Sequence, residues 1–140
     1  MISARLRNFI YVVLAFLVIL DLVLSTVATF FPDTWFMVFH GVHYDSLDVE
    51  GLIRRTGALW IAFTLLQFLA LIFWRKSPWW LVLVAGVRLT ELFSDWTYLY
   101  VAHTITTAGR IGLFIAPPGN LAFGIFLIWA YKKIMQCGGT

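Results

Sequence analysis

The chain has little charge and a single cysteine. Only 12% of its 140 residues are Asp, Glu, Lys or Arg, whereas a soluble domain usually has about 25%. The lone Cys137 cannot form an internal disulfide, so cysteine usage does not indicate a redox compartment. Because 61% of the residues are hydrophobic, the composition predicts an integral membrane protein with no room for a separate soluble domain.

Several motifs that carry well-known chemistry are also missing from the sequence. It has no Cys-x-x-Cys haem motif, no glycine-rich nucleotide-binding pattern and no HExxH helix. No nucleophile has an evident histidine base, since Ser46 and His43 are neighbours in a polar loop. These absences favour a non-catalytic protein. The net charge of +3 is explained by membrane topology and indicates no nucleic-acid partner.

Four apolar stretches approach or exceed the roughly 20 residues that a helix needs to cross a bilayer. They run from about Phe9 to Phe30, Leu52 to Trp74, Trp79 to Val101, and Ile111 to Tyr131. The first is too long for the apolar region of a typical signal peptide and is interrupted by Asp21, so we expect a retained helix. Alternating segments typical of barrel strands do not occur. The sequence therefore predicts an all-α, four-helix integral membrane bundle that forms one domain over residues 1–140.

Basic residues indicate how this bundle is oriented. They precede the first stretch, fill the turn between the second and third, and follow the fourth: Arg5, Arg7, Arg75, Lys76, Lys132 and Lys133. Four crossings place all of them on one side, which the positive-inside rule makes cytoplasmic. We therefore expect both termini inside (N-in/C-in) in a multi-pass protein of a bacterial cytoplasmic (inner) membrane, in contact with the lipid bilayer.

Two segments should depart from a plain helical bundle. The outer loop of residues 31–51 is long enough to hold a turn at Pro32 and a short amphipathic piece that lies in the interface and caps the bundle. In the fourth stretch, Pro117 and Pro118 leave two alternatives. Either a separate interfacial or re-entrant segment precedes a helix that starts at Pro118, or one span is kinked there.

The third stretch carries charges that hydrocarbon would not tolerate. Arg88, Glu91 and Asp95 share one helical face, so that face must meet protein, water or a bound group. Counting depth along each helix places Asp21 beside Arg88 and Glu91 near mid-membrane. We therefore predict that Arg88 pairs with Asp21 or Glu91. Asp95 lies nearer the outer surface, where we expect it to pair with Arg54 or Arg55.

Small and polar residues extend this predicted interior. Asn120 and Gly124 share a face of the fourth stretch, whereas Gln67 points away from Arg54 and is expected to lie outside the polar stripe. The candidate polar core or ligand-binding residues are Asp21, Arg54, Arg55, Arg88, Glu91, Asp95 and Asn120.

Three interpretations of this polar set are open. The residues can be interhelical ion pairs without chemistry. They can instead line a pocket that opens outward near Pro117 and Pro118 and takes a quinone, a lipid or another amphipathic ligand. A proton or ion path is disfavoured because acidic residues do not extend across the whole membrane.

Three histidines lie on the predicted outer side. His40 and His43 could bind one metal ion or a pigment if their segment is helical, and His103 could complete the set. The alternative is that these histidines cap loops or contact lipid head groups. The sequence identifies no other cofactor.

The start of the second stretch, Leu52-Ile53-Arg54-Arg55-Thr56-Gly57, has a Leu-x-Arg-x-x-Gly pattern. With the four-helix layout and the outer loop, it resembles small bacterial membrane proteins of the DoxX-like kind. The resemblance implies an accessory role, since some members are small partners of quinone-linked oxidoreductases. The charged stripe and the Pro117-Pro118 pair match no motif of that group.

Two hypotheses about function follow. The first is a non-catalytic accessory or assembly subunit of a larger bacterial membrane complex, quinone-linked or engaged in electron transfer, whose partners are other membrane subunits. The alternative is a lipophilic-ligand binding protein, or an enzyme, that uses the stripe carried by Arg88.

Overall fold

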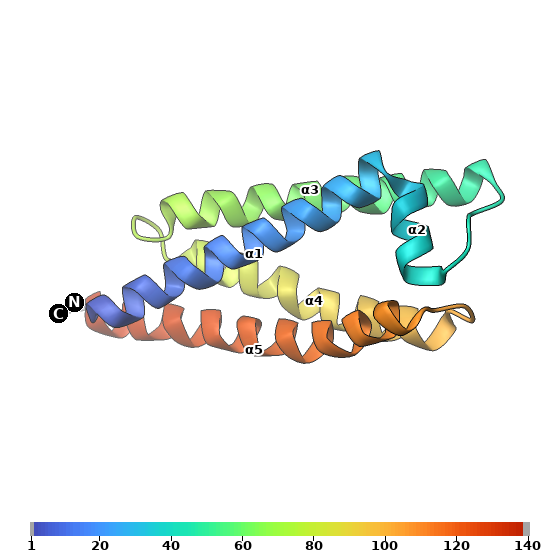
Figure 1. Ribbon diagram of the computed structural model, residues 1–140. Helices are drawn as coiled ribbons and strands as arrows, with labels where there is room; N and C mark the ends of the chain where they lie inside the picture. The colour runs from blue at the N-terminus through green and yellow to red at the C-terminus, as the bar shows by residue number, and fades with distance from the viewer. Residues whose placement is uncertain (1, 139–140) are drawn as a thin grey trace.

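The computed structural model describes residues 2–138 and is helical over most of that range. Its elements are α1 (Ala4–Phe30), α2 (Pro32–His40), α3 (Leu47–Phe73), α4 (Trp79–Val101) and α5 (Thr107–Gly138). The long helices run side by side, and the short α2 lies across one end of them (Figure 1). The all-helical class is thus as predicted. The amphipathic piece expected after Pro32 is present as α2.

The two ends of the molecule differ in what they contain. Both described termini and the turn between α3 and α4 lie at one end, which we call the basic end (Figure 1). The segment 41–46, the segment 102–106 and α2 lie at the opposite end, which we call the α2 end.

Helix boundaries follow from short local signals. The Ser3 hydroxyl accepts a hydrogen bond from the Leu6 backbone N–H and caps α1, and Ser46 does the same for α3 through Val49. Pro32 stands at the first position of α2, where its missing N–H costs nothing. Gly41 ends α2 with a φ of 72°, a conformation that favours glycine.

The prolines do not break α5, which runs without interruption through Pro117 and Pro118. The predicted separate segment before Pro118, and with it the Pro-broken helix, is therefore wrong. Each proline removes one backbone donor, but the helical turns on both sides keep their own hydrogen bonds. Pro117 is fully buried, so the helix also gains packing at this point.

Among the described residues, three helices are long and apolar enough to cross a membrane: α1, α3 and residues Thr107–Cys137 of α5. The third predicted stretch, α4, is not one of them. Arg88, Glu91 and Asp95 lower its hydropathy, although it lies along α5 for much of its length. A helical membrane protein is consistent with these three spans.

The long helices form two pairs, because α1 packs mainly against α3 and α4 mainly against α5. Apolar side chains join the two pairs at the basic end. This core consists of Ile10, Val13, Leu14, Leu17, Ala70, Trp74, Leu81, Val84, Ala85, Leu127 and Ala130. Toward the α2 end the buried apolar side chains are few, and the two pairs are visibly farther apart (Figure 1). The polar residues lie where the apolar core ends.

Candidate functional site

Where the apolar core ends, a network of polar side chains connects all four long helices. Asp21 of α1 accepts hydrogen bonds at one carboxylate oxygen from Gln67 of α3, over 2.6 Å, and from the guanidinium of Arg88 of α4. Arg88 also pairs with Glu91 over 2.9 Å and donates a longer bond of 3.4 Å to Asn120 of α5. The predicted pairing of Arg88 with Asp21 or Glu91 is confirmed, since both carboxylates contact it.

The network is deeply buried at one side and more open at the other. Asp21, Gln67 and Arg88 are buried, and Arg88 is only 2% exposed. Glu91 and Asp95 are half-buried. Asn120 links them to the core, because its amide donates to Asp95 over 3.4 Å. The polar set is therefore sealed toward the basic end and partly accessible toward the α2 end.

Charges in this network do not balance if every group is ionised, since it holds three carboxyl groups and one guanidinium. Among the described residues, no second Lys or Arg pairs with the carboxylates of Asp21, Glu91 or Asp95. The Nε of Arg88 and the Oε1 of Gln67 are buried without a hydrogen-bond partner in the described part of the chain. An uncompensated carboxylate attracts a cation or a hydrogen-bond donor.

Gln67 was expected outside the polar stripe, and this expectation is wrong. It is fully buried and bonds directly to Asp21. That prediction took the position of Arg54 around the helix axis as the inward direction, but the side chain of Arg54 is exposed. Gly57 is the better reference, because it is buried against α1 on the same helix.

The predicted pairing of Asp95 with Arg54 or Arg55 is also wrong. Arg54 instead pairs with Glu50, one turn earlier on its own helix, over 2.8 Å and donates to the Thr29 carbonyl of α1 over 2.6 Å. Arg55 is exposed and has no ion pair within the described residues. Neither arginine belongs to the polar core.

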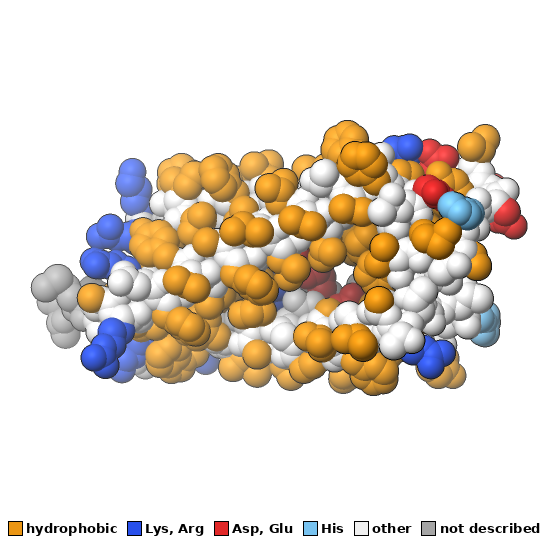
Figure 2. All heavy atoms as spheres, in the orientation of Figure 1, with side chains coloured by type: hydrophobic (Ala, Val, Ile, Leu, Met, Phe, Trp, Pro, Cys, Tyr) orange, Lys and Arg blue, Asp and Glu red, His pale blue; other side chains and the backbone are white. Residues whose placement is uncertain are grey.

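The surface is hollowed beside this network. Figure 2 shows a gap in this face between α2 and the middle of the bundle, with acidic side chains at its edge. Its position fits the distribution of buried residues, because the apolar core lies almost wholly at the basic end. The polar network thus borders a space that side chains do not fill.

The short α2 closes the α2 end by bonding to the α4–α5 pair. Thr106 binds two α2 carbonyls, through its N–H to Phe39 over 2.8 Å and through its hydroxyl to Val38 over 2.6 Å. His40 contacts the Thr104 carbonyl with Nδ1 and the Tyr98 hydroxyl with Nε2. Because a carbonyl can only accept, Nδ1 donates its hydrogen to the Thr104 carbonyl.

The histidines do not form the predicted metal site. Both nitrogens of His40 are engaged as described, and His43 binds Asp33 with Nδ1 over 2.7 Å. Within residues 2–138, no three His, Cys, Asp or Glu side chains are grouped so that they could hold a metal ion. The hypothesis that His40, His43 and His103 form a metal site is therefore wrong, whereas binding of a pigment by these histidines stays a prediction. Two of the three histidines instead connect segments at the α2 end.

Helix α4 also has a second polar face, which sequence reasoning did not single out. Gly86, Thr90, Ser94 and Thr97 recur at helical spacing on the side opposite Arg88 and Asp95, and all four are exposed. A Cβ at Gly86 would meet no atom within 4 Å. The signal was present as a small-xxx-small pattern, in which small residues four apart let another helix approach closely.

Comparisons with protein-family models, with curated proteins and with solved structures find no match to this chain. The DoxX-like resemblance therefore stays a prediction.

Proposed function

We propose that this protein is a non-catalytic accessory subunit that spans the membrane and joins a larger complex through the exposed face of α4. The observation that carries the proposal is the stripe of Gly86, Thr90, Ser94 and Thr97 on the outside of the helix pair. A helix whose outer face contacts only lipid has no need of small and hydroxyl-bearing residues. Such residues are typical of interfaces between transmembrane helices.

The internal face of the same helix supports this role. Arg88 fixes α4 to α1 through Asp21 and to α5 through Asn120, so the rotation of α4 about its own axis is set and its stripe is held outward. A partner helix would therefore meet a preformed surface. In this proposal the chain crosses a bacterial inner membrane four times with both termini inside, and a quinone-linked complex is the kind of partner that the DoxX-like resemblance implies.

The test uses the full chain extracted from its own membranes in mild detergent, with the mass of the released assembly measured by native mass spectrometry. Gly86→Leu should reduce the assembly to the single chain, because leucine fills the space that a partner helix needs. Gly112→Leu is the matched control, since Gly112 is also an exposed helical glycine with nothing within 4 Å of a Cβ. Single-chain masses for both variants and the parent would contradict the proposal. If the parent protein were released as a dimer of this chain, the exposed face of α4 would be a surface for self-association and not for binding a different subunit.

A second candidate function is binding of an amphipathic ligand in the gap beside the network. The excess of carboxyl groups and the half-buried positions of Glu91 and Asp95 favour it. A head group with an amine or hydroxyl could donate to these carboxylates, as the hydroxyls of a hydroquinone would, whereas a quinone carbonyl can only accept. Trp96 and Tyr98 lie on the same helix toward the α2 end, near the expected entrance.

A thermal unfolding experiment in detergent separates this candidate from the first. A long-chain alkylamine should raise the unfolding temperature of the parent protein and not that of Asp95→Asn. A long-chain alcohol with an alkyl group of equal length measures how much of the shift comes from the alkyl group alone. Equal shifts for the parent and Asp95→Asn would exclude this site and leave the accessory proposal untouched.

A further inference from the structure

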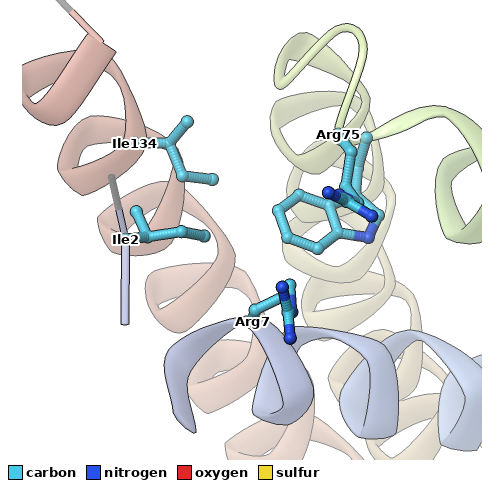
Figure 3. A pocket seen from close by; sticks show the side chains of 5 residues that line it. Ile2, Arg7, Arg75 and Ile134 are labelled. Carbon is cyan, nitrogen blue, oxygen red and sulfur yellow. The ribbon is translucent and has the colours of Figure 1, made fainter. Parts of the chain in front are cut away.

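The basic end contains two clefts that share Arg75 and lie away from the polar network. The smaller, of about 240 Å³, is lined by Ile2, Arg7, Trp74, Arg75 and Ile134. The larger, of about 400 Å³, is lined by Tyr11, Ile72, Arg75 and Lys76. Figure 3 shows the side chains of Arg7 and Arg75 extending toward the same space, with Ile2 and Ile134 across from them.

Within residues 2–138, no carboxylate balances the positive charge at this end. The segments that form it, residues 2–14, 70–84 and 124–138, contain no Asp or Glu. Arg7 and Arg75 are exposed and form no ion pair within the described residues. Figure 2 shows Lys and Arg side chains gathered there without an acidic one among them on the face in view.

Trp74 provides a second and independent observation. Its side chain is 2% exposed, and its indole Nε1 is buried with no hydrogen-bond partner in the part of the chain that the structure describes. Tryptophan can only donate, and the guanidinium groups of Arg7 and Arg75 offer no acceptor in return. Buried N–H groups in native proteins are almost always paired. No residue from 2 to 138 supplies the missing acceptor, so a bound group that carries acceptor atoms could complete this site.

From these contacts we infer that the smaller cleft binds a phosphate group, with Arg7 and Arg75 as the cationic partners and the Trp74 N–H as a neutral donor. Arginine presents several N–H donors that match phosphate oxygens. Tyr11 holds the indole in place through an edge contact with ring centroids 5.3 Å apart. The inference does not depend on the partner surface of α4, which is a different part of the molecule.

The phosphate belongs to the head group of an anionic phospholipid. Ile2 and Ile134 line the same cleft as the arginines, and Ile72 lines the adjoining one, so apolar surface for acyl chains adjoins the cationic groups. Basic pockets between transmembrane helices are suited to such head groups. The assignment to lipid, rather than to free phosphate, rests on the proposed membrane location.

The experiment titrates the full chain in non-ionic detergent with phosphatidylglycerol and counts bound lipid by native mass spectrometry. The double variant Arg7→Gln/Arg75→Gln should bind about tenfold more weakly or worse, since each basic residue near a lipid surface contributes severalfold. Lys132→Gln/Lys133→Gln is the matched control, because it removes equal charge from the same end without changing either cleft. An equal loss in both double variants would overturn the site in favour of general surface charge.

Two further arms complete the test. Trp74→Phe keeps an aromatic ring but removes the N–H together with part of the indole, so it should weaken binding severalfold, and unchanged affinity would overturn the role of Nε1. Millimolar inorganic phosphate should fail to displace the lipid. Displacement would keep a phosphate site but overturn its assignment to lipid. Circular dichroism of every variant shows that a loss of binding is not a loss of fold.

Discussion

Gly57 of α3 lies directly against the backbone of Thr29 in α1. A Cβ at position 57 would be 2.7 Å from the Thr29 backbone nitrogen and 3.0 Å from the carbonyl carbon of Ala28. Main-chain atoms cannot move aside as a flexible side chain can. Gly57→Ala should therefore force the two helices apart and lower the free energy of unfolding by roughly 1–3 kcal/mol.

The control for this change lies on the same helix. At Gly51 an added Cβ would meet nothing within 4 Å, so Gly51→Ala should be neutral or should stabilise by up to about 1 kcal/mol through higher helix propensity. Chemical unfolding in detergent, followed by circular dichroism, measures both variants. Equal stability of the two would mean that α1 and α3 are not this close in the folded protein.

Removing the central cation should be more damaging. Arg88→Leu leaves the buried Asp21 without its charged partner, and breaking a buried pair in this way costs about 3–5 kcal/mol. Asp21→Asn in the same chain should recover much of the loss, because an amide at position 21 can still bond to Gln67. Detergent unfolding midpoints give the comparison.

Arg55→Leu provides the reference for loss of an arginine without loss of an ion pair, since Arg55 is exposed and unpaired within the described chain. It should lie within about 0.5 kcal/mol of the parent. If Arg88→Leu were equally mild, the charges at the centre would not be structural pairs. The ligand-binding candidate would then gain support.

The proposed orientation predicts which positions react with a membrane-impermeant thiol reagent. In a chain with Cys137→Ser, single cysteines at Ser46 and His103 should label from outside intact cells, because both residues are exposed at the α2 end. A cysteine at Lys133, at the basic end, should label only after the cells are opened. Outside labelling at position 133 would reverse the orientation.

The attachment of α2 can be tested with one hydroxyl group. Tyr98→Phe removes the contact with His40 Nε2 while keeping the ring, so amide hydrogen exchange in Pro32–His40 should become severalfold faster, as expected for a bond worth about 0.5–1.5 kcal/mol. Tyr100→Phe is the matched control, because Tyr100 is 90% exposed and its hydroxyl makes no hydrogen bond in the described structure. Exchange measured by mass spectrometry should not change at the apolar core in either variant.

The sequence was sufficient where spacing along one helix, or equal depth along two helices, determined the outcome. The spacing of Arg88 and Glu91 brings them together on α4, and equal depth along two helices brings Asp21 to the same place. The amphipathic segment after Pro32 is likewise local.

Contacts that depend on the relative rotation of two helices, rather than on depth alone, were not predictable. The sequence predicted an ion pair between Asp95 and Arg54 or Arg55. In the structure Arg54 instead pairs with Glu50, which lies one turn away on the same helix and is therefore always within its reach. Helical phase places Gln67 correctly only after Gly57 is known to face α1, and nothing in one sequence reveals that. The continuity of α5 through Pro117 depends on its burial, which is also a property of the folded bundle.

The uneven placement of the apolar core means that the two ends of the molecule should respond differently to change. At the basic end many weak apolar contacts together hold the helices in place. A substitution such as Leu14→Ala should therefore lower the free energy of unfolding in proportion to the side-chain volume removed. At the α2 end a few directional bonds, among them that between Thr106 and Phe39, join α2 to the α4–α5 pair. Loss of such a bond is a discrete event, and the α2 end should open as a unit while the basic end stays closed.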